Sequence, residues 1–541
     1  MSTTSLTHLG GKWFSWWQAL PTQKPRVSAV LAGILLTVSF PPISLPWGMW
    51  VGIPLLWGLS FREKPYRLLY VALLLWNLGG CYWLMLTALS APNFGEAVLS
   101  FVAGAAAILA NPLLMLGVFA VWRWLFRQMF EVAHVRAVWL FIPLWAAFEY
   151  LHFRWELSWS WLSLGFGWSE WSYWRSLASL IGPTGVSVWT LVGAALLYEA
   201  RLGAFLTWGF LTPALGILLS PRSTTTSPRA VYAIQPNIDP YVKFAEFSPD
   251  SQVGRLLSLL PSNPPQGALI LLPETAIPVG VSLDTWPNEP FIRPFFEYAV
   301  RHKVNVLLGV VGYKYFPPGA PPSPSARLLP DGGSYEAYNA ALLLRPDTVQ
   351  VHIKSRLVPF VERAPFLEVF AFLRHWHIDL GGGFGNFGKP QSQSPLTLYP
   401  DETPVAVAIC YESIFAHDLR QRLPERPALL AILTNDGWWK KSSGFWQHLT
   451  YGQLTATALG VPAVRSANTG VSALLSHTGE RLASLPYDQI GIVEGQLAPR
   501  TPGTLYYRLG EIGWIGLSTF ALILWWIQSY HSRRFSRPSE K

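Results

Sequence analysis

The sequence is poor in cysteine and in charged side chains. Only Cys81 and Cys410 occur among 541 residues, and 13% of residues are charged. Two cysteines in such different surroundings do not form a disulfide framework, which excludes the disulfide-stabilised class of secreted domains. We interpret Cys81, in "LGGCYWLML", as a small buried hydrophobic residue. Because a soluble domain carries about 25% charged residues, much of this chain is expected not to face water.

Apolar residues take the place of the missing charge. Hydrophobic residues make up 51% of the chain, and 28 residues are Trp, whose ring favours the membrane–water boundary. The net charge is +9, but the basic residues lie in short loops between apolar segments or in the tail "HSRRFSRPSEK". No run of them resembles a nucleic-acid-binding stripe. The composition therefore predicts an integral membrane protein rather than a nucleic-acid-binding one.

About eight apolar segments are candidates for membrane crossings, although the first two are short for a span of about 20 residues. They are 27–43, 46–61, 67–88, 97–122, 137–152, 177–199, 203–220 and 511–530. Lys and Arg gather in alternate loops, which predicts that both termini are cytoplasmic and that 221–510 lies outside. The Trp-rich segment 153–174 is too polar to span, and we expect either an interfacial or re-entrant piece or an ordinary aromatic belt.

From residue 221 the pattern changes to short apolar runs that alternate with polar loops and helical candidates. Examples are "ALILLPETAIP" (268–278), "VNVLLGVVGY" (304–313) and "PVAVAIC" (404–410). Continuous apolar strands are typical of a sheet that helices cover. The alternation predicts an α/β domain.

Three predicted strands end on side chains that can do chemistry together. Glu274 follows "LILLP", Lys354 closes "VQVHIK" and Cys410 closes "VAVAIC". A carboxylate can take the proton of a thiol, the thiolate is a nucleophile, and an ammonium stabilises the oxyanion formed when a carbonyl is attacked. Taken singly, Glu274 is also compatible with a helix or turn cap, Lys354 with a solvated strand end and Cys410 with the core.

The short sequence motifs around these residues resemble those of a known group of enzymes. "LLPETAIP", "HIKSRLVPFVE" and "AICYESIF" are similar to the carbon–nitrogen hydrolase (nitrilase) superfamily, and the flanking membrane segments narrow the resemblance to its apolipoprotein N-acyltransferase family. The resemblance implies an αββα sandwich at 221–505, between a transmembrane helical domain at 1–220 and a C-terminal transmembrane helix with a basic tail at 506–541. It makes Glu274 the general base, Lys354 the oxyanion stabiliser and Cys410 the nucleophile.

The same resemblance points to residues that support the triad. Glu362 matches a second glutamate that orders the site, and Tyr411 and Glu412 match the pair after the cysteine. The backbone N–H of Tyr411 is expected to be a second oxyanion donor. For Glu362 and Glu412, a structural ion pair or hydrogen bond is the alternative.

Three aromatic residues are candidates for substrate contact. Phe244 stands where the family often has Trp, so a packing role survives but a hydrogen bond from an indole does not. Trp438 and Trp439, in "NDGWWKKSSG", are expected either on a hydrophobic arm over a lipid entrance or on a loop that dips into the interface.

Two further patterns carry less weight. The glycines Gly383, Gly385 and Gly388 match G-x-G-x-x-G but have no strand before and helix after, so we expect a loop. The pair His375 and His377 has no third ligand at a suitable spacing, and we expect no metal.

The resemblance implies transfer of a fatty acyl chain from phospholipid, through a thioester on Cys410, to the α-amine of the diacylglyceryl-cysteine of an apolipoprotein. We expect no cofactor, a monomer, and a place in the bacterial inner membrane with the catalytic domain on the periplasmic side. The first alternative is a membrane-tethered nitrilase-type amidase that uses water as the acceptor. The second is a membrane scaffold or transporter, which an intact Glu, Lys and Cys disfavour.

Overall fold

The computed structural model describes residues 19–511, with gaps at 91–93, 130–133, 220–223, 242, 244–247, 286–288, 321–322, 371, 373–384 and 391–393, together with residues 513 and 516. Several predictions fall outside these residues and are not discussed structurally. They are Phe244, the pair His375 and His377, Gly383, and nearly all of the last apolar segment, 511–530.

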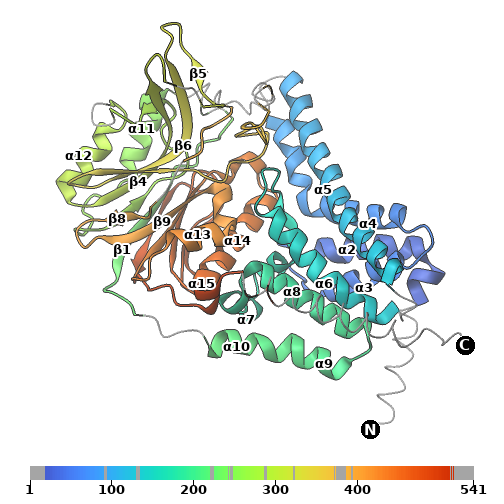
Figure 1. The fold of residues 1–541 in the computed structure, drawn as a ribbon. Helices are drawn as coiled ribbons and strands as arrows, with labels where there is room; N and C mark the ends of the chain where they lie inside the picture. The colour runs from blue at the N-terminus through green and yellow to red at the C-terminus, as the bar shows by residue number, and fades with distance from the viewer. Residues whose placement is uncertain are drawn as a thin grey trace, which may run out of the picture.

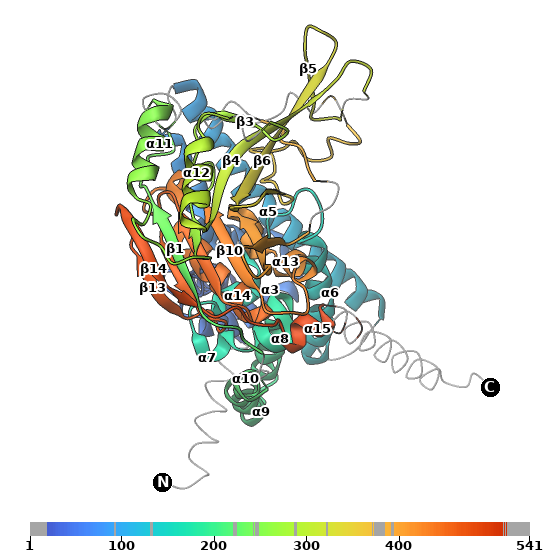
Figure 2. The same ribbon diagram turned by 90° about the vertical axis from the view of Figure 1, so that its left-hand side faces the viewer.

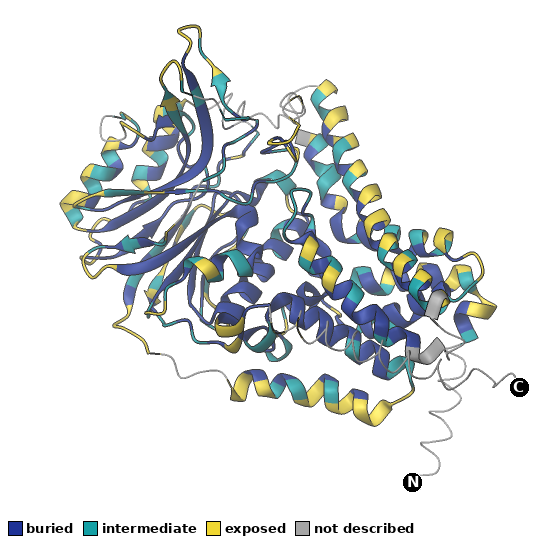
Figure 3. Cartoon of the chain, viewed as in Figure 1, coloured by how far each residue is buried: buried dark blue, intermediate teal, exposed yellow. Residues whose placement is uncertain are grey.

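Apolar helices form the N-terminal part of the structure, coloured blue to teal at the right of Figure 1. The longest continuous helix, α5 (Phe94–Met129), is also among the most apolar. Its outer face is exposed (Figure 3), as expected for a surface that lipid covers. The helices are α2 (Pro25–Val38), α3 (Trp47–Ser60), α4 (Tyr66–Cys81) with the 3-10 turn η1 (Tyr82–Ser90), α5 (Phe94–Met129), α6 (His134–His152), α8 (Ala178–Tyr198), α9 (Leu202–Leu206), η4 (Thr207–Leu211) and α10 (Thr212–Leu218).

Among the described residues, three helices are long and apolar enough to cross a membrane: Tyr66–Leu89, Phe94–Arg127 and Ala178–Tyr198. Three shorter apolar helices accompany them, Pro25–Val38, Ala137–His152 and Leu202–Leu218. These findings support a membrane-associated helical part. The count of about eight crossings stays a prediction.

The Trp-rich segment 153–174 contains no span. It folds into the short turns η2 (Ser160–Leu162), η3 (Leu164–Trp168) and the start of α7 (Ser172–Arg175), and most of its residues are buried. Non-helical backbone at membrane depth is tolerated only where protein or water covers it. Here the protein covers it, since the segment packs between the apolar helices and the second domain.

Two sheets, packed face to face, form the second domain (Figures 1 and 2). In the first sheet the order is β14-β1-β2-β4-β6-β5, with β3 paired to β4 and β7 to β6; in the second it is β13-β12-β11-β10-β9-β8. The strands are β1 (Arg229–Gln235), β2 (Leu269–Leu271), β3 (Gly280–Ser282), β4 (Asn305–Phe316), β5 (Arg327–Leu328), β6 (Ser334–Leu344), β7 (Val349–Ile353), β8 (Leu396–Leu398), β9 (Thr403–Ile409), β10 (Leu429–Thr434), β11 (Ala463–Ala467), β12 (Ser472–Leu475), β13 (Arg481–Leu485) and β14 (Gly491–Leu497).

Helices cover the outer face of each sheet. The first sheet carries α11 (Pro249–Ser258) and α12 (Arg293–His302), and the second carries α13 (Ala416–Arg422), α14 (Ser443–Leu459) and α15 (Leu505–Leu509). Strand alternation explains the layers, because successive side chains point to opposite faces. Leu269 and Leu271 belong to the core between the sheets, whereas Ile270 belongs to the core under α11 and α12. The predicted αββα arrangement is present.

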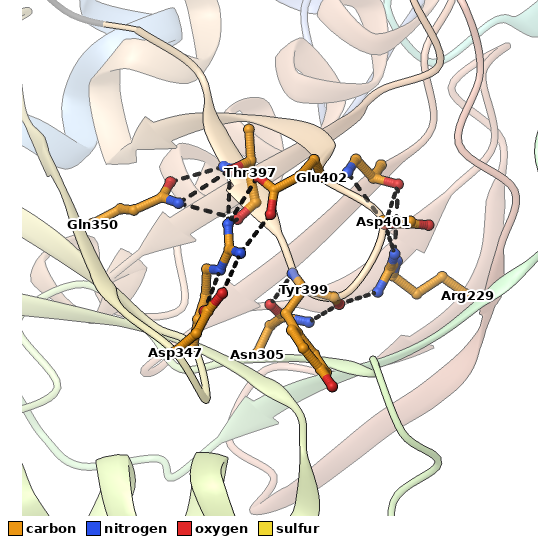
Figure 4. Close-up of polar contacts among 10 residues, drawn as sticks. Arg229, Asn305, Asp347, Gln350, Thr397, Tyr399, Asp401 and Glu402 are labelled. Atoms are coloured by element: carbon orange, nitrogen blue, oxygen red, sulfur yellow. Dashed lines mark hydrogen bonds and ion pairs between the residues drawn. The ribbon is translucent and has the colours of Figure 1, made fainter.

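A polar network ties the two sheets together where β9 begins (Figure 4). Arg345, after β6, donates two parallel hydrogen bonds of 2.9 Å to Asp347 and also binds Glu402 in the β8–β9 turn. Asn305, at the start of β4, donates to the carbonyl of Tyr399 at 2.9 Å and accepts from its N–H at 2.7 Å. The seven residues of β9 then run about 23 Å to Cys410, so the network fixes one end of the strand and Cys410 follows the other.

The helical layer on the second sheet docks on the apolar helices through α14. Gln447 of α14 accepts from the indoles of Trp83 (3.1 Å) and Trp161 (2.7 Å). Its amide donates to the carbonyls of Pro41 (2.9 Å) and Gly80 (3.0 Å). One buried side chain thus joins α14 to three separate parts of the N-terminal apolar helices, which we call the helical unit.

Candidate active site

The three predicted triad residues follow β2, β7 and β9 and come together at one edge of the sandwich. The Nζ of Lys354 lies 3.1 Å from Oε1 of Glu274, and all three side chains are at most 7% exposed. The charges of Glu274 and Lys354 both act on the thiol of Cys410. The structure therefore places Glu274, Lys354 and Cys410 in one buried cluster.

Backbone geometry brings Glu274 close to β4. The N–H of Gly309, on β4, donates to the carbonyl of Pro273 at 3.2 Å. A Cβ at position 309 would stand 2.7 Å from the Cα of Glu274, so only glycine permits this approach. The next residue, Thr275, has φ of 45°, an unusual conformation for a β-branched residue. The carboxylate is thus held by a constrained turn.

Glu362 and Asn339 complete the polar surroundings of Lys354. The ammonium donates to Oε1 of Glu362 at 2.8 Å. The amide of Asn339, on β6, donates to Glu274 and to Glu362, each at 2.8 Å, and the N–H of Val358 donates to the second oxygen of Glu362 at 2.8 Å. Glu362 therefore lies beside the predicted triad and contacts its lysine directly.

The charge state of Lys354 follows from these contacts. Burial disfavours an ammonium, but the carboxylates of Glu274 and Glu362 outweigh burial and raise the pKa of Lys354. The lysine is therefore a permanent cation, and it suits a role as an electrostatic partner rather than as a base.

Cys410 begins a 3-10 turn, η7 (Cys410–Ile414), directly after β9. Its φ is 50°, a left-handed conformation that is uncommon for a residue with a Cβ. Burial raises the pKa of the thiol, Glu274 raises it further, and Lys354 acts in the opposite direction. The thiol is consequently protonated at rest, and a nucleophilic role for it would require a base.

Glu412 is a buried carboxylate that holds together the backbone on either side of the cluster. Its carboxylate accepts from the N–H of Ile409 (2.9 Å), the N–H of Ser355 (2.8 Å) and Arg422 (3.1 Å), and it contacts His352. Burial alone would raise the pKa of Glu412, but Arg422 and His352 outweigh it and hold it well below its ordinary value. Since Ser355 follows Lys354 and Ile409 precedes Cys410, Glu412 fixes two strand ends together.

Tyr411 turns its ring away from the triad and into the helical unit. Its hydroxyl donates to the carbonyl of Ser158 at 2.9 Å, and its ring stacks on Trp159 and Trp161 with centroids 6.2 and 6.3 Å apart. The backbone N–H groups at the start of a helical turn have no partner inside that turn. That of Tyr411 directly follows Cys410, and its oxyanion role stays a prediction.

The two predicted tryptophans, in η8 (Asp436–Trp439), face different neighbours. The ring of Trp439 packs against Trp83 at 4.8 Å and Trp161 at 5.6 Å, in the same aromatic layer as Tyr411. Trp438 instead packs against Tyr241 at 5.1 Å. Only Trp439 joins the layer beside the helical unit, and substrate contact by either residue stays a prediction.

Sequence reasoning missed four polar residues near the site. Asn339 bridges the two carboxylates, and Lys243 donates to the carbonyl of Thr275. Burial lowers the pKa of Lys243 to about 7, although the charge of Glu274 raises it. Asp436 and His448 form a buried pair that reaches the carbonyl of Cys410. A lone Asn inside the apolar run "YNAALLL" was the one available signal for Asn339.

Two family models match this chain. Residues 233–504 match the family described as Carbon-nitrogen hydrolase. The chain belongs to the carbon–nitrogen hydrolase family. Residues 32–196 match the Apolipoprotein N-acyltransferase N-terminal domain, so this carbon–nitrogen hydrolase carries the helical unit of that branch. The family resemblance inferred from the three sequence motifs is confirmed.

Curated relatives match the carbon–nitrogen hydrolase chain over most of its length. "Apolipoprotein N-acyltransferase" of Chlorobaculum tepidum is 29% identical over 517 residues, covering 89% of this chain and 92% of that protein. That of Haemophilus influenzae is 26% identical and covers 94% and 95%, and that of Azotobacter vinelandii is 28% identical and covers 94% and 96%. The similarity thus includes both the helices and the sandwich.

Proposed function

We propose that the chain is an N-acyltransferase that moves a fatty acyl chain from a phospholipid, through a thioester on Cys410, to the α-amine of the diacylglyceryl-cysteine of an apolipoprotein. The observation that carries the proposal is the position of Cys410. Its thiol feels the charges of Glu274 and Lys354, while the ring of the next residue, Tyr411, packs into the helical unit. In this proposal the nucleophile Cys410 therefore lies between its base, Glu274, and the helical unit that enters the membrane.

The first half-reaction forms the thioester. Glu274 takes the proton of Cys410 as the thiolate attacks the ester carbonyl of the phospholipid. Lys354 and the N–H of Tyr411 stabilise the oxyanion. When the intermediate collapses, the lysophospholipid leaves as an alkoxide and takes the proton back from Glu274. The acyl group stays on sulfur.

The second half-reaction consumes the thioester. The neutral amine of the acceptor attacks the thioester carbonyl, and Glu274 accepts a proton from the amine. The thiolate of Cys410 leaves and recovers that proton, which restores the resting enzyme. No further reactant is needed, because the ester of the donor already carries an activated acyl group.

The charges of the cluster suit proton transfer within it. Lys354 carries one positive charge, and it contacts the two carboxylates of Glu274 and Glu362. Moving the thiol proton to Glu274 relocates a negative charge beside Lys354 without adding one. A second negative charge on sulfur, with Glu274 still ionised, would be much more costly in a site from which water is excluded.

The helical unit lets both substrates reach Cys410 while their acyl chains stay in the lipid bilayer. Moving an acyl chain into water costs about 0.8 kcal/mol for each methylene, so the carbonyl must reach the sulfur while the chain remains in hydrocarbon. We place the catalytic domain on the periplasmic side of the bacterial inner membrane, with both termini cytoplasmic. The phospholipid donor and the monomeric state belong to the same proposal.

The amidase alternative is not favoured. It would share the triad but would have no use for a helical unit of the acyltransferase type or for the aromatic contacts between Tyr411 and that unit. The two differ in the acceptor, since an amidase releases the acyl group to water. Free fatty acid without acylated lipoprotein would support the amidase.

The proposal is tested by incubating the full-length protein with labelled phospholipid and searching for an adduct that hydroxylamine removes. Wild-type protein should carry the label, whereas Cys410→Ala should carry none. Cys410→Ser should give, at most, an adduct that hydroxylamine removes slowly, because an oxygen ester replaces the thioester. Lipoprotein acylation by Cys410→Ala at the wild-type rate would overturn the mechanism.

A further inference from the structure

His448 of α14 is fully buried, and its ring reaches the residue that carries the nucleophile. Its Nε2 lies 3.0 Å from the carbonyl oxygen of Cys410 and 2.9 Å from Oγ of Ser413. Its Nδ1 lies 2.8 Å from Oδ1 of Asp436. The mechanism above uses none of these contacts.

The neighbours of the ring fix the proton on its Nε2. Asp436 accepts from Thr434 at 2.8 Å and from Arg465 at 2.6 Å. Burial opposes ionisation of Asp436, but Arg465 and His448 outweigh it and lower the pKa of this carboxyl, so Asp436 is an acceptor. The Cys410 carbonyl is an acceptor as well. Nε2 of His448, 3.0 Å from that carbonyl, is therefore the donor in this contact.

We propose that His448 is a positioning residue for the nucleophile. With its Nδ1 side held by Asp436, its Nε2–H donates to the carbonyl of Cys410 and fixes the peptide that follows it. This inference rests on the proposed role of Cys410 as the nucleophile.

This hydrogen bond explains how Cys410 keeps its unusual backbone conformation. A φ of 50° is costly for a residue with a Cβ, and such a conformation persists only where the surroundings over-determine it. A hydrogen bond from Nε2–H of His448 to the carbonyl of Cys410 supplies part of that constraint. It holds the peptide after the nucleophile and hence the direction in which the N–H of Tyr411 points.

The groups that face the ring fix its orientation. Thr434, Asp436 and Arg465 face its Nδ1 side, and Ser413 and the carbonyl of Cys410 face its Nε2 side. The indoles of Trp161 and Trp439 pack against it at 5.8 and 5.5 Å. The ring therefore cannot turn without breaking these contacts.

The first experiment measures how fast the full-length protein forms the hydroxylamine-sensitive adduct with labelled phospholipid. His448→Leu removes the donor to the Cys410 carbonyl and should slow thioester formation roughly tenfold. In His448→Gln the amide can still donate to that carbonyl, so this variant should recover most of the wild-type rate. Equal losses in His448→Leu and His448→Gln would overturn the proposal.

Thr457→Val is the matched control on the same helix. Thr457 donates to the carbonyls of Gln453 (2.9 Å) and Thr478 (2.8 Å). It should leave the rate of thioester formation unchanged. An equal loss in Thr457→Val and His448→Leu would show that loosening α14 causes the effect, and the proposal would be wrong.

A second measurement needs no variant to be active. In wild-type protein with ¹⁵N-labelled histidine, NMR should show a proton on Nε2 of a ring whose signal is missing from His448→Gln. A bare Nε2 at position 448 would overturn the proposal. Absence of any hydroxylamine-sensitive adduct on the wild type would instead refute the proposed function, so the two failures are distinct.

Discussion

The ammonium of Lys354 lies 3.1 Å from the carboxylate of Glu274, and both side chains are almost completely shielded from solvent. A buried ion pair of this kind is a weak source of stability, because desolvation offsets the attraction. In the mechanism proposed above the role of this pair is chemical, since it places a positive charge and a carboxylate beside the thiol of Cys410.

Replacing Lys354 by Met should abolish thioester formation while the protein still folds. The change removes the cation shared by Glu274 and Glu362 and the main stabiliser of the oxyanion, and loss of one such group costs about 10²- to 10³-fold in rate. Adduct formation with labelled phospholipid measures the loss. Lys354→Arg keeps the charge and should retain more activity than Lys354→Met. Normal adduct formation by Lys354→Met would remove Lys354 from the site.

Replacing Glu274 by Gln should change two reactions of Cys410 in opposite directions. The charge of Glu274 raises the pKa of the thiol, so its removal lowers that pKa and speeds alkylation by iodoacetamide at a fixed pH. Acyl transfer should fall sharply, because the base is gone. Alkylation and acylation that fall together would indicate a distorted site rather than a missing base.

Replacing Asn339 by Asp should slow thioester formation, although the two side chains have nearly the same shape. The amide of Asn339 donates to both Glu274 and Glu362, whereas a carboxylate would repel both and compete for Lys354. We expect a loss of about tenfold or more, measured as the rate of adduct formation. Wild-type rates in Asn339→Asp would show that the bridge is not needed.

The ends of three strands could be predicted from the sequence because each pairs an apolar run with a reactive residue. Glu274, Lys354 and Cys410 were found in this way, and the alternating strand pattern predicted the α/β domain. Asn339 and His448 were missed, because each lies inside an apolar strand or helix and contacts the site only through folding, Asn339 through Glu274 and His448 through the carbonyl of Cys410.

The number of membrane crossings was harder to predict than the catalytic domain. Apolar composition marks a segment as buried or lipid-facing but does not distinguish the two. The helix α8, for example, is apolar because it packs against α14 and α6 as well as because of lipid. Segment 153–174, in contrast, was correctly separated from the spans by its Ser and Gly content.

Replacing Glu412 by Gln should lower the stability of the sandwich at neutral pH by about 3 kcal/mol, since Arg422 would remain buried without its charged partner. The folded-state pKa of Glu412 is depressed. Its contribution is therefore complete above the unfolded-state pKa of about 4.3 and is lost as pH falls toward the folded-state value. Thermal unfolding from pH 3 to 7 should show a shallower acid limb in Glu412→Gln than in wild type.

The exposed pair Arg293 and Glu297 provides the control for this measurement. Its members are 68% and 54% exposed, and such surface pairs contribute little. Glu297→Gln should therefore leave both the unfolding temperature and its pH dependence unchanged. An equal effect of the two substitutions would contradict the special position of Glu412.

The mass of the species bound to Cys410 after exposure to native phospholipid tests the central claim most directly. The account predicts a peptide containing Cys410 that is heavier by one fatty acyl group, that loses this mass in hydroxylamine, and that returns to the free thiol when a diacylglyceryl-peptide with a free amine is added. A Cys410 peptide that never gains an acyl group, while the protein still acylates the acceptor peptide, would contradict it.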